Sequence, residues 1–230
     1  MGSHGIRDRV AIVGMGCTAF GEHWDKGADD LLVEAATECF RSAKVEPDQV
    51  DAFWLGTMGS GFSGMLFSEA LKIHNKPVSR LENMCATGSE AMRNAAYAVA
   101  SGAYDLVMAI GVEKLKDSGF SGLTGSNPPN DGTTPNMTAP AMFSLLFPAY
   151  AKKYRVEEKT LKDVISRIAW KNHRNGARNP KAQFRSEVPM EKIQASPKVA
   201  GQLGIFDCSG VSDGSAAAIL CRAEDAHKYT

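Results

Sequence analysis

The run DLVMAIGVE at residues 105–113 constrains the fold of this chain most strongly. Between its two acidic ends it is apolar without interruption, a pattern typical of a strand covered on both faces of a sheet. Strand-like and helical segments alternate along the chain before it. The other expected strands cover residues 9–16, 51–58, 78–84 and 212–222, and the expected helices cover 29–43, 66–74 and 86–101. This order predicts an α/β fold with a parallel sheet and right-handed crossovers.

The regular alternation breaks after residue 116. Residues 117–140 are rich in Gly, Ser, Asn and Pro, which indicates a long functional loop. Two helices are expected next, at 141–155, where Pro148 should kink or split the helix, and at 160–174. Strand character then returns. We therefore expect an α/β domain formed by residues 6–116 and 205–230, an inserted loop domain at 117–204, and a tag remnant at 1–5.

The charge balance argues against a strongly charged partner. The 230 residues include 26 Lys and Arg and 26 Asp and Glu, so the net charge is zero. No long-range field would attract nucleic acid or an anionic membrane, and we expect neither as a partner. No apolar stretch approaches the roughly 18 residues of a membrane span, and no signal-peptide pattern precedes the first strand. We therefore expect a soluble, cytoplasmic protein.

The five cysteines are odd in number, lie far apart and form no CxxC pair. We therefore expect neither a disulfide framework nor a metal site. The segment GMGCTA at 14–19 fits the dinucleotide fingerprint G-x-G-x-x-A, but the next expected helix begins about ten residues later than that fingerprint requires. We assign its glycines to a tight turn and expect no bound NAD.

Cys85 lies where an expected strand gives way to an expected helix, within RLENMCATGSEAM at 80–92. A lone cysteine is commonly a small buried hydrophobe. At a helix N-terminus, however, the free N–H groups and the helix dipole favour the thiolate and lower the pKa of a nucleophile. The small residues at 86–89 leave room for a substrate, and the N–H of Cys85 could donate to an oxyanion. From the residues alone, a core cysteine and a nucleophile both stay open.

Two segments, found together in this order, resemble the thiolase superfamily. They are ENMCATGSEAMRNAAYAVASGAYDLVMAIGVEKLKD at 82–117 and FDCSGVSDGSAAAIL at 206–220. The segments RVAIVGMGCTAFGE, TAPAMF and KNHRNGARNPKAQF look like one branch of it, the sterol-carrier-protein-type and archaeal acetoacetyl-CoA thiolases. The resemblance covers essentially all residues after the tag.

This resemblance implies a thiolase-like α/β fold with a mostly parallel mixed sheet, helices on both faces and an inserted loop domain that holds coenzyme A. It places the family's nucleophile at Cys85, a pantetheine-contacting turn at Ser209 and Gly210, and a loop-domain residue lining the active site at Met142. The implied activity is that of an acyl-CoA C-acyltransferase, which cleaves or forms a 3-oxoacyl-CoA through a cysteine acyl-enzyme. Coenzyme A would be a substrate, with no permanently bound cofactor.

The chain matches only the first of the two similar α/β halves of a thiolase subunit, plus the loop domain. The second half normally supplies an activating histidine, an acid/base cysteine and a further oxyanion-hole loop, none of which can be placed here. Either the chain is a fragment, or another polypeptide completes it. We expect a homo- or hetero-oligomer, with an OB-fold/zinc-ribbon partner as in related thiolases. The alternatives are a non-catalytic or heteromeric subunit, a retro-aldolase acting on a steroid-like acyl-CoA, and a ketosynthase-like condensing enzyme.

Overall fold

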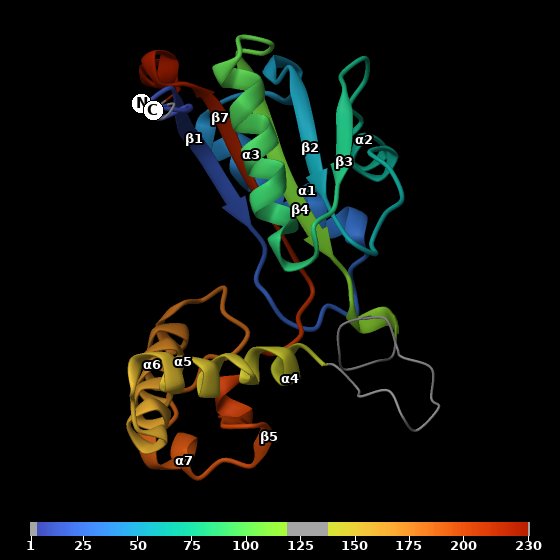
Figure 1. Cartoon of the computed structure of the whole chain (residues 1–230). Helices are drawn as coiled ribbons and strands as arrows, with labels where there is room; N and C mark the ends of the chain where they lie inside the picture. Colours follow the sequence, from blue (N-terminus) through green and yellow to red (C-terminus); the bar gives the residue numbers. More distant parts are fainter. Residues whose placement is uncertain (1–3, 119–137, 230) are drawn as a thin grey trace, which may run out of the picture. The chain divides into compact units, whose positions relative to one another are not determined.

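The computed structural model describes residues 4–118 and 138–229. The chain divides into two compact units, Met1–Phe120 with Ser212–Thr230, and Ser121–Val211 (Figure 1). The second unit extends beyond the expected insertion at 117–204, because residues 205–211 pack within it. There Oδ2 of Asp207 lies 2.5 Å from Nζ of Lys162. The expected tag remnant at 1–5 and the expected loop at 117–140 lie largely outside the described residues.

The first unit is built around a five-stranded mixed sheet. Its strands are β1 (Val10–Cys17), β2 (Ala52–Gly56), β3 (Val78–Leu81), β4 (Leu106–Glu113) and β7 (Gly214–Arg222), in the order β1-β7-β4-β2-β3. β2 pairs in parallel with β3 and β4, whereas β7 pairs antiparallel with β1 and β4. Only β7 is reversed in this sheet, so the prediction of a mostly parallel mixed sheet is confirmed.

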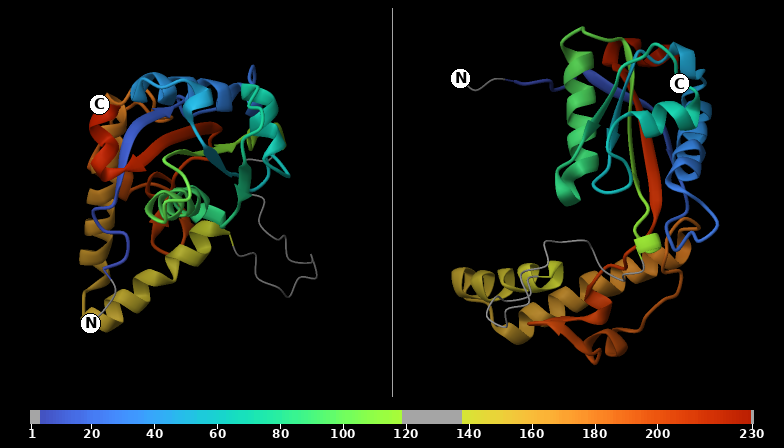
Figure 2. Two further views of the ribbon diagram at one scale, coloured as in Figure 1. Left: turned by 90° about the horizontal axis from the view of Figure 1, so that it is seen from above. Right: turned by 90° about the vertical axis from the view of Figure 1, so that its right-hand side faces the viewer.

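Helices cover both faces of this sheet (Figure 2). α1 (Ala28–Ala43) and α2 (Met65–Leu71) pack on one face, and α3 (Thr87–Ala100) packs on the other. The first face buries large side chains, including Leu31, Phe53, Phe67 and Ile219. The α3 face buries mainly small ones, including Ala52, Ala91, Ala95 and Ala109. Small residues on both surfaces let α3 lie close to the strands.

The glycines of the GMGC segment lie inside β1 and not in a turn, so the assignment to a tight turn was wrong. A Cβ on Gly14 would lie 2.6 Å from Cβ of Ala43, and one on Gly16 would lie 2.5 Å from the backbone N of Cys39. Both contacts are with α1. The glycines are therefore needed for the close approach of α1 to the sheet.

The second unit is mainly helical. It contains α4 (Ala139–Ser144), α5 (Leu146–Tyr154), α6 (Glu158–Arg178), α7 (Met190–Gln194) and a small hairpin of β5 (Lys198–Ala200) and β6 (Leu203–Gly204). The expected helix at 141–155 is split, as Pro148 predicted. The break falls at Leu145 because Pro148 has no N–H to donate to the carbonyl four residues earlier, that of Ser144.

Two local predictions differ from the structure. The strand expected at 78–84 ends at Leu81, because Met84 has a φ of 49°, in the left-handed region that a strand does not use. The helix expected after β7 is the 3₁₀ helix η5 (Ala223–Lys228). Within the described ranges, no helix is both long enough and apolar enough to cross a membrane.

Candidate active site

Cys85 lies in a tight turn between β3 and α3. The turn is the 3₁₀ helix η2 (Met84–Ala86), which leads directly into Thr87 at the start of α3. The left-handed φ of 49° at Met84 is costly for a residue with a side chain, and such conformations cluster at functional sites. Within the first turn of a helix the N–H groups have no acceptor inside the helix, so the N–H of Cys85 points to no intrahelical partner.

Cys85 is the exposed cysteine among the five, all of which lie in the described residues. Cys17 and Cys208 are half-buried, and Cys39 and Cys221 are buried, as expected for core residues. Burial raises the pKa of Cys39 to about 12 and also raises the pKa values of Cys208 and Cys221. These three thiols are therefore poor sources of thiolate at neutral pH.

Thr87 holds the turn that carries Cys85. Its hydroxyl accepts a 2.8 Å hydrogen bond from the N–H of Asn83 and donates a 2.6 Å hydrogen bond to the carbonyl of Met84. The residue is buried, and a Cβ on Gly56 would lie 3.0 Å from its methyl group. Gly56 at the end of β2 thus leaves the space that Thr87 occupies, which fixes the start of α3 against the sheet.

A carboxylate network supports the same end of the sheet. Glu113, at the end of β4, accepts hydrogen bonds from the hydroxyl groups of Thr57 and Ser60, at 3.1 and 3.0 Å, and from the N–H of Met58. Nη2 of Arg80, on β3, donates to the carbonyls of Thr57 and Met58 at 2.8 and 3.0 Å. These bonds tie the ends of β2, β3 and β4 together, next to the segment that leads into Cys85.

Asp213 is a buried carboxylate at the same end of the sheet, and it accepts several hydrogen bonds. It is fully buried and accepts hydrogen bonds from the N–H groups of His23, Leu115 and Lys116, at 3.1, 2.8 and 2.9 Å, and from Nζ of Lys114 at 3.0 Å. Residues 115 and 116 precede the second unit in the sequence, and Asp213 follows it. One carboxylate therefore fastens both connecting segments to the first unit.

The surroundings of Asp213 keep it ionised. Burial by itself would raise its pKa, but the N–H groups of Lys116 and His23 and the ammonium of Lys114 outweigh this and hold the pKa below its usual value. Lys114 is buried too, and although burial would lower its pKa, its bonds to Asp117 and Asp213 raise it. Both partners are therefore charged at neutral pH.

The second unit contains the other candidate residues. Ser209 is exposed and Gly210 half-buried, in the turn after the 3₁₀ helix η4 (Ile205–Asp207). Nε2 of Gln183 donates to the carbonyl of Val211 at 3.3 Å and so anchors the far side of this turn. Met142 lies on α4, 44% exposed. Cys85 belongs to the first unit, so the candidates are divided between two bodies.

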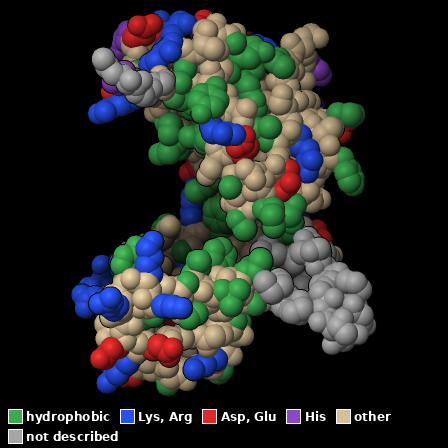
Figure 3. All heavy atoms as spheres, viewed as in Figure 1, with side chains coloured by type: hydrophobic (Ala, Val, Ile, Leu, Met, Phe, Trp, Pro, Cys, Tyr) green, Lys and Arg blue, Asp and Glu red, His purple; other side chains and the backbone are tan. Residues whose placement is uncertain are grey.

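Residues 138–211 are basic although the whole chain is neutral. They include thirteen Lys and Arg and only six Asp and Glu. Figure 3 shows such basic side chains on the surface of this unit. The excess favours an anionic ligand over a neutral one. Across the described residues, no group of three or more His, Cys, Asp or Glu could hold a metal ion.

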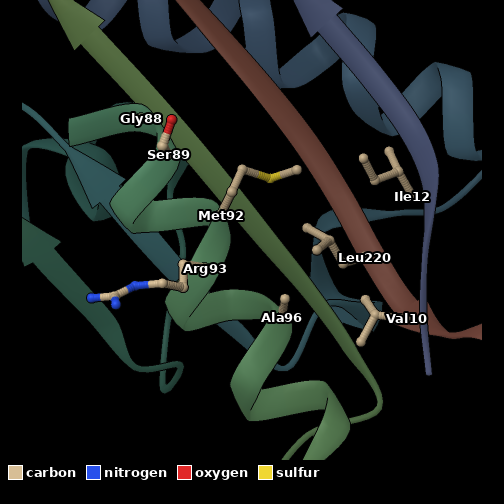
Figure 4. Close-up of a pocket in the computed structure, with 8 residues that line it drawn as sticks. All are labelled: Val10, Ile12, Gly88, Ser89, Met92, Arg93, Ala96 and Leu220. Atoms are coloured by element: carbon tan, nitrogen blue, oxygen red, sulfur yellow. The ribbon is translucent and has the colours of Figure 1, made fainter. Parts of the chain in front are cut away.

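An apolar groove of about 550 Å³ lies between α3 and strands β1 and β7 of the sheet (Figure 4). Val10 and Ile12 of β1 and Leu220 of β7 form one wall, and Met92 and Ala96 of α3 form the other. Ile12 is 50% exposed. The exposed side of α3 also carries an ion pair between Arg93 and Glu90.

The sequence of this chain matches one known protein family over most of its length. Residues 10–224 match the family model described as the thiolase N-terminal domain. The chain belongs to the thiolase family. It is 34% identical over 233 residues to an acetyl-CoA acetyltransferase of Methanothermobacter thermautotrophicus and 31% identical over 239 residues to sterol carrier protein 2 of Homo sapiens. The predicted superfamily and branch are thereby confirmed.

Solved structures share the fold of this chain. The Ltp2-ChsH2(DUF35) aldolase matches with a TM-score of 0.77 at 23% identity, over 97% of this chain and 58% of that one. A human mitochondrial 3-ketoacyl-CoA thiolase in complex with CoA matches with a TM-score of 0.70 at 18% identity, over 97% and 67%. The match to the archaeal relative covers 98% of this chain but only 60% of that protein, and the match to the human one covers 96% of this chain and 43% of that protein.

The sequence analysis missed the supporting roles of Asp213, Glu113 and Thr87. Each had a usable signal. Asp213 and Glu113 adjoin the ends of strongly apolar strands, where an unpaired carboxylate would be costly, so each required several donors. Thr87 follows the cysteine by two residues, at the start of a helix, where a hydroxyl commonly bonds to the backbone.

Proposed function

We propose that this thiolase-family chain is an acyltransferase that cleaves or forms a 3-oxoacyl-CoA through an acyl-enzyme on Cys85. The observation that carries the proposal is the position of Cys85: exposed, in a turn with a left-handed residue, at the N-terminus of α3. The family match and the archaeal acetyl-CoA acetyltransferase relatives supply the reaction class.

In the cleavage direction, the thiolate of Cys85 attacks the 3-oxo carbonyl of the substrate and forms a tetrahedral oxyanion. The N–H of Cys85 is one donor for that oxyanion. The bond between C2 and C3 then breaks, its electron pair passes to C2, and the resulting enolate of acetyl-CoA is protonated. Finally the thiolate of free coenzyme A attacks the cysteine thioester, takes the acyl group and regenerates the thiolate of Cys85.

Coenzyme A enters this proposal as a substrate and not as a resident cofactor. The basic excess of residues 138–211 supports binding of its phosphates. The turn of Ser209 and Gly210 supports contact with the pantetheine arm, because exposed backbone there can exchange hydrogen bonds with its amides. Met142, exposed on α4, is proposed to contact the acyl end of the substrate.

A Cys85→Ser variant tests the covalent step. Serine is close to cysteine in size, so the turn should keep its structure, but without a strong base serine is a poor nucleophile. In the assembly that includes the missing acid/base groups, we expect thiolysis of acetoacetyl-CoA to fall by more than about tenfold, with an unchanged melting temperature. Cys17→Ser is the matched control, because Cys17 is half-buried on β1. Activity of the Cys85→Ser variant within about tenfold of the unaltered protein contradicts acyl transfer through Cys85.

A retro-aldolase acting on a steroid-like acyl-CoA is the second candidate. It is favoured by the structure of the Ltp2-ChsH2(DUF35) aldolase, whose TM-score to this chain exceeds that of the human thiolase complex. A retro-aldol cleavage needs no cysteine acyl-enzyme, so the Cys85→Ser variant would retain cleavage of a β-hydroxyacyl-CoA. The same variant thus separates the two reactions.

We propose that another polypeptide segment covers the groove between α3 and β1 and supplies the remaining acid/base groups. The chain spans 60% of the archaeal relative, and the groove leaves Ile12 half exposed. The covering segment can belong to a longer form of this chain or to a separate subunit. The Ltp2-ChsH2(DUF35) aldolase supports a heteromeric assembly with a DUF35 partner. A non-catalytic subunit would show no thiolysis in any such assembly.

A further inference from the structure

The ring of Phe184 lies directly against Gly210. A Cβ placed on Gly210 would lie 2.7 Å from Cζ and 2.9 Å from Cε2 of Phe184, and 2.8 Å from Oε1 of Gln183. Real Cβ atoms essentially never approach other heavy atoms this closely. The φ angle of Gly210 is not in the left-handed region, so its backbone conformation is open to any residue. Glycine is therefore required at 210 by its neighbours and not by its own backbone.

Phe184 cannot easily move away from the turn. A Cβ on Gly176 of α6 would lie 2.8 Å from the carbonyl oxygen of Phe184, so the backbone at 184 packs tightly on the helix. The ring centroid lies 6.3 Å from that of His173, which in turn meets Phe206 edge-on at 5.8 Å. The amide of Gln183, by contrast, is the end of a flexible side chain and can shift. The backbone of Phe184 is thus held in place on α6, and its ring lies against Gly210.

The exposure of Phe184 argues against a purely structural role. The residue is 50% exposed, so it gains only part of the stabilisation available to a buried phenylalanine. An aromatic ring held in place yet half open to solvent, beside an exposed backbone turn, is typical of a ligand-contacting surface.

We propose that Phe184 is a positioning residue that sets the backbone of the Ser209–Gly210 turn for the pantetheine arm of coenzyme A. This rests on the proposed function, in which that turn contacts coenzyme A. The ring excludes any side chain at 210, and the turn thereby keeps its backbone groups accessible to a narrow, extended ligand. Phe184 acts through the turn and not on the reacting atoms.

A double-mutant cycle on the full chain tests this, with coenzyme A binding measured by calorimetry. We expect Gly210→Ala to weaken binding by about tenfold, because the new methyl group must displace the ring or the turn. Phe184→Leu, whose side chain ends before the Cζ position, should weaken it by about threefold. The double variant should bind no more weakly than Phe184→Leu alone. Gly21→Ala is the control, because a Cβ there meets nothing within 4 Å.

Each outcome decides one statement. Non-additive losses, with the double variant matching Phe184→Leu, support the positioning role, because a loss of folding alone would not restore affinity. If the two losses of affinity simply multiply in the double variant, the positioning role of Phe184 is overturned. The proposal that the protein binds coenzyme A would still hold. Failure of the unaltered protein to bind coenzyme A overturns the proposed function and this inference with it.

Discussion

Replacing Asp213 by asparagine removes the charge from a fully buried carboxylate that accepts four hydrogen bonds, one of them from the buried ammonium of Lys114. Asparagine keeps one acceptor oxygen and turns an NH₂ group toward donors that need an acceptor. Removing one partner of a buried ion pair costs about 3–5 kcal/mol. Because part of the hydrogen bonding survives, we expect a loss near the lower end, about 3 kcal/mol.

Urea denaturation followed by the fluorescence of Trp24 and Trp54, both in the first unit, measures this loss. With a slope of about 2 kcal/mol per molar urea, the midpoint should fall by about 1.5 M. Asp117→Asn is the matched control: Asp117 also pairs with Lys114, at 2.5 Å, but is 58% exposed, so its loss should be within about 1 kcal/mol. Equal urea midpoints for the two variants would refute the stabilising role assigned to Asp213.

The pH dependence of this difference follows from the lowered pKa of Asp213. The unfolded chain has the ordinary value of 3.8, and the folded value lies below it. The charge of Asp213 therefore contributes its full stabilisation above pH 4 to 5 and loses it as the pH falls through the lower folded value. The gap between the unaltered protein and Asp213→Asn should be constant from about pH 7 to 5 and should shrink below about pH 4. A gap that widens on acidification contradicts this sign.

Two further predictions concern packing at the sheet. Thr87→Val leaves the N–H of Asn83 and the carbonyl of Met84 without their partner, so the free energy of unfolding should fall by about 2 kcal/mol. Thr87→Ser keeps the hydroxyl and should lower the free energy of unfolding by about half as much. A larger loss for the serine variant than for the valine variant would contradict the assigned bonds. Gly16→Ala places a methyl group 2.5 Å from a backbone atom of α1 and should destabilise the first unit by about 2–3 kcal/mol, while Gly21→Ala should leave the melting temperature unchanged. Equal melting temperatures for the two glycine variants would show that α1 does not pack as described.

The order of strands and helices was predictable because each element of the first unit has a buried face with its own period. The apolar run before Glu113 forms β4, and the stripe through Leu31 and Cys39 forms the buried face of α1. The end of β3 was not predictable, since nothing in the residues at 82–84 signals a left-handed φ at Met84. The two strands at 198–204 were missed because they are only three and two residues long, too short to show alternation.

The need of Asp213 for several donors could be predicted from its place beside an apolar strand, but the identity of those donors could not. Asp213 bonds to His23, 190 positions away, and to Lys116, 97 positions away, so its role exists only in the folded chain. Gly14 and Gly16 fitted a local fingerprint, yet the structure uses them for contact with a helix more than ten residues later. The position of Cys85, in contrast, could be predicted from the local sequence, because a strand, a turn and a helix meet there.

Peptide mapping of the acyl-enzyme tests the central claim most directly. The purified protein is incubated with acetyl-CoA, quenched in acid, digested and examined by mass spectrometry. Acyl transfer through Cys85 predicts one acetyl group on the peptide that contains this residue, removed again when free coenzyme A is added before the quench. The peptides of Cys17, Cys39, Cys208 and Cys221 should stay unmodified. An acetyl group on any of those four, or none on Cys85, would contradict the assignment of Cys85 as the nucleophile.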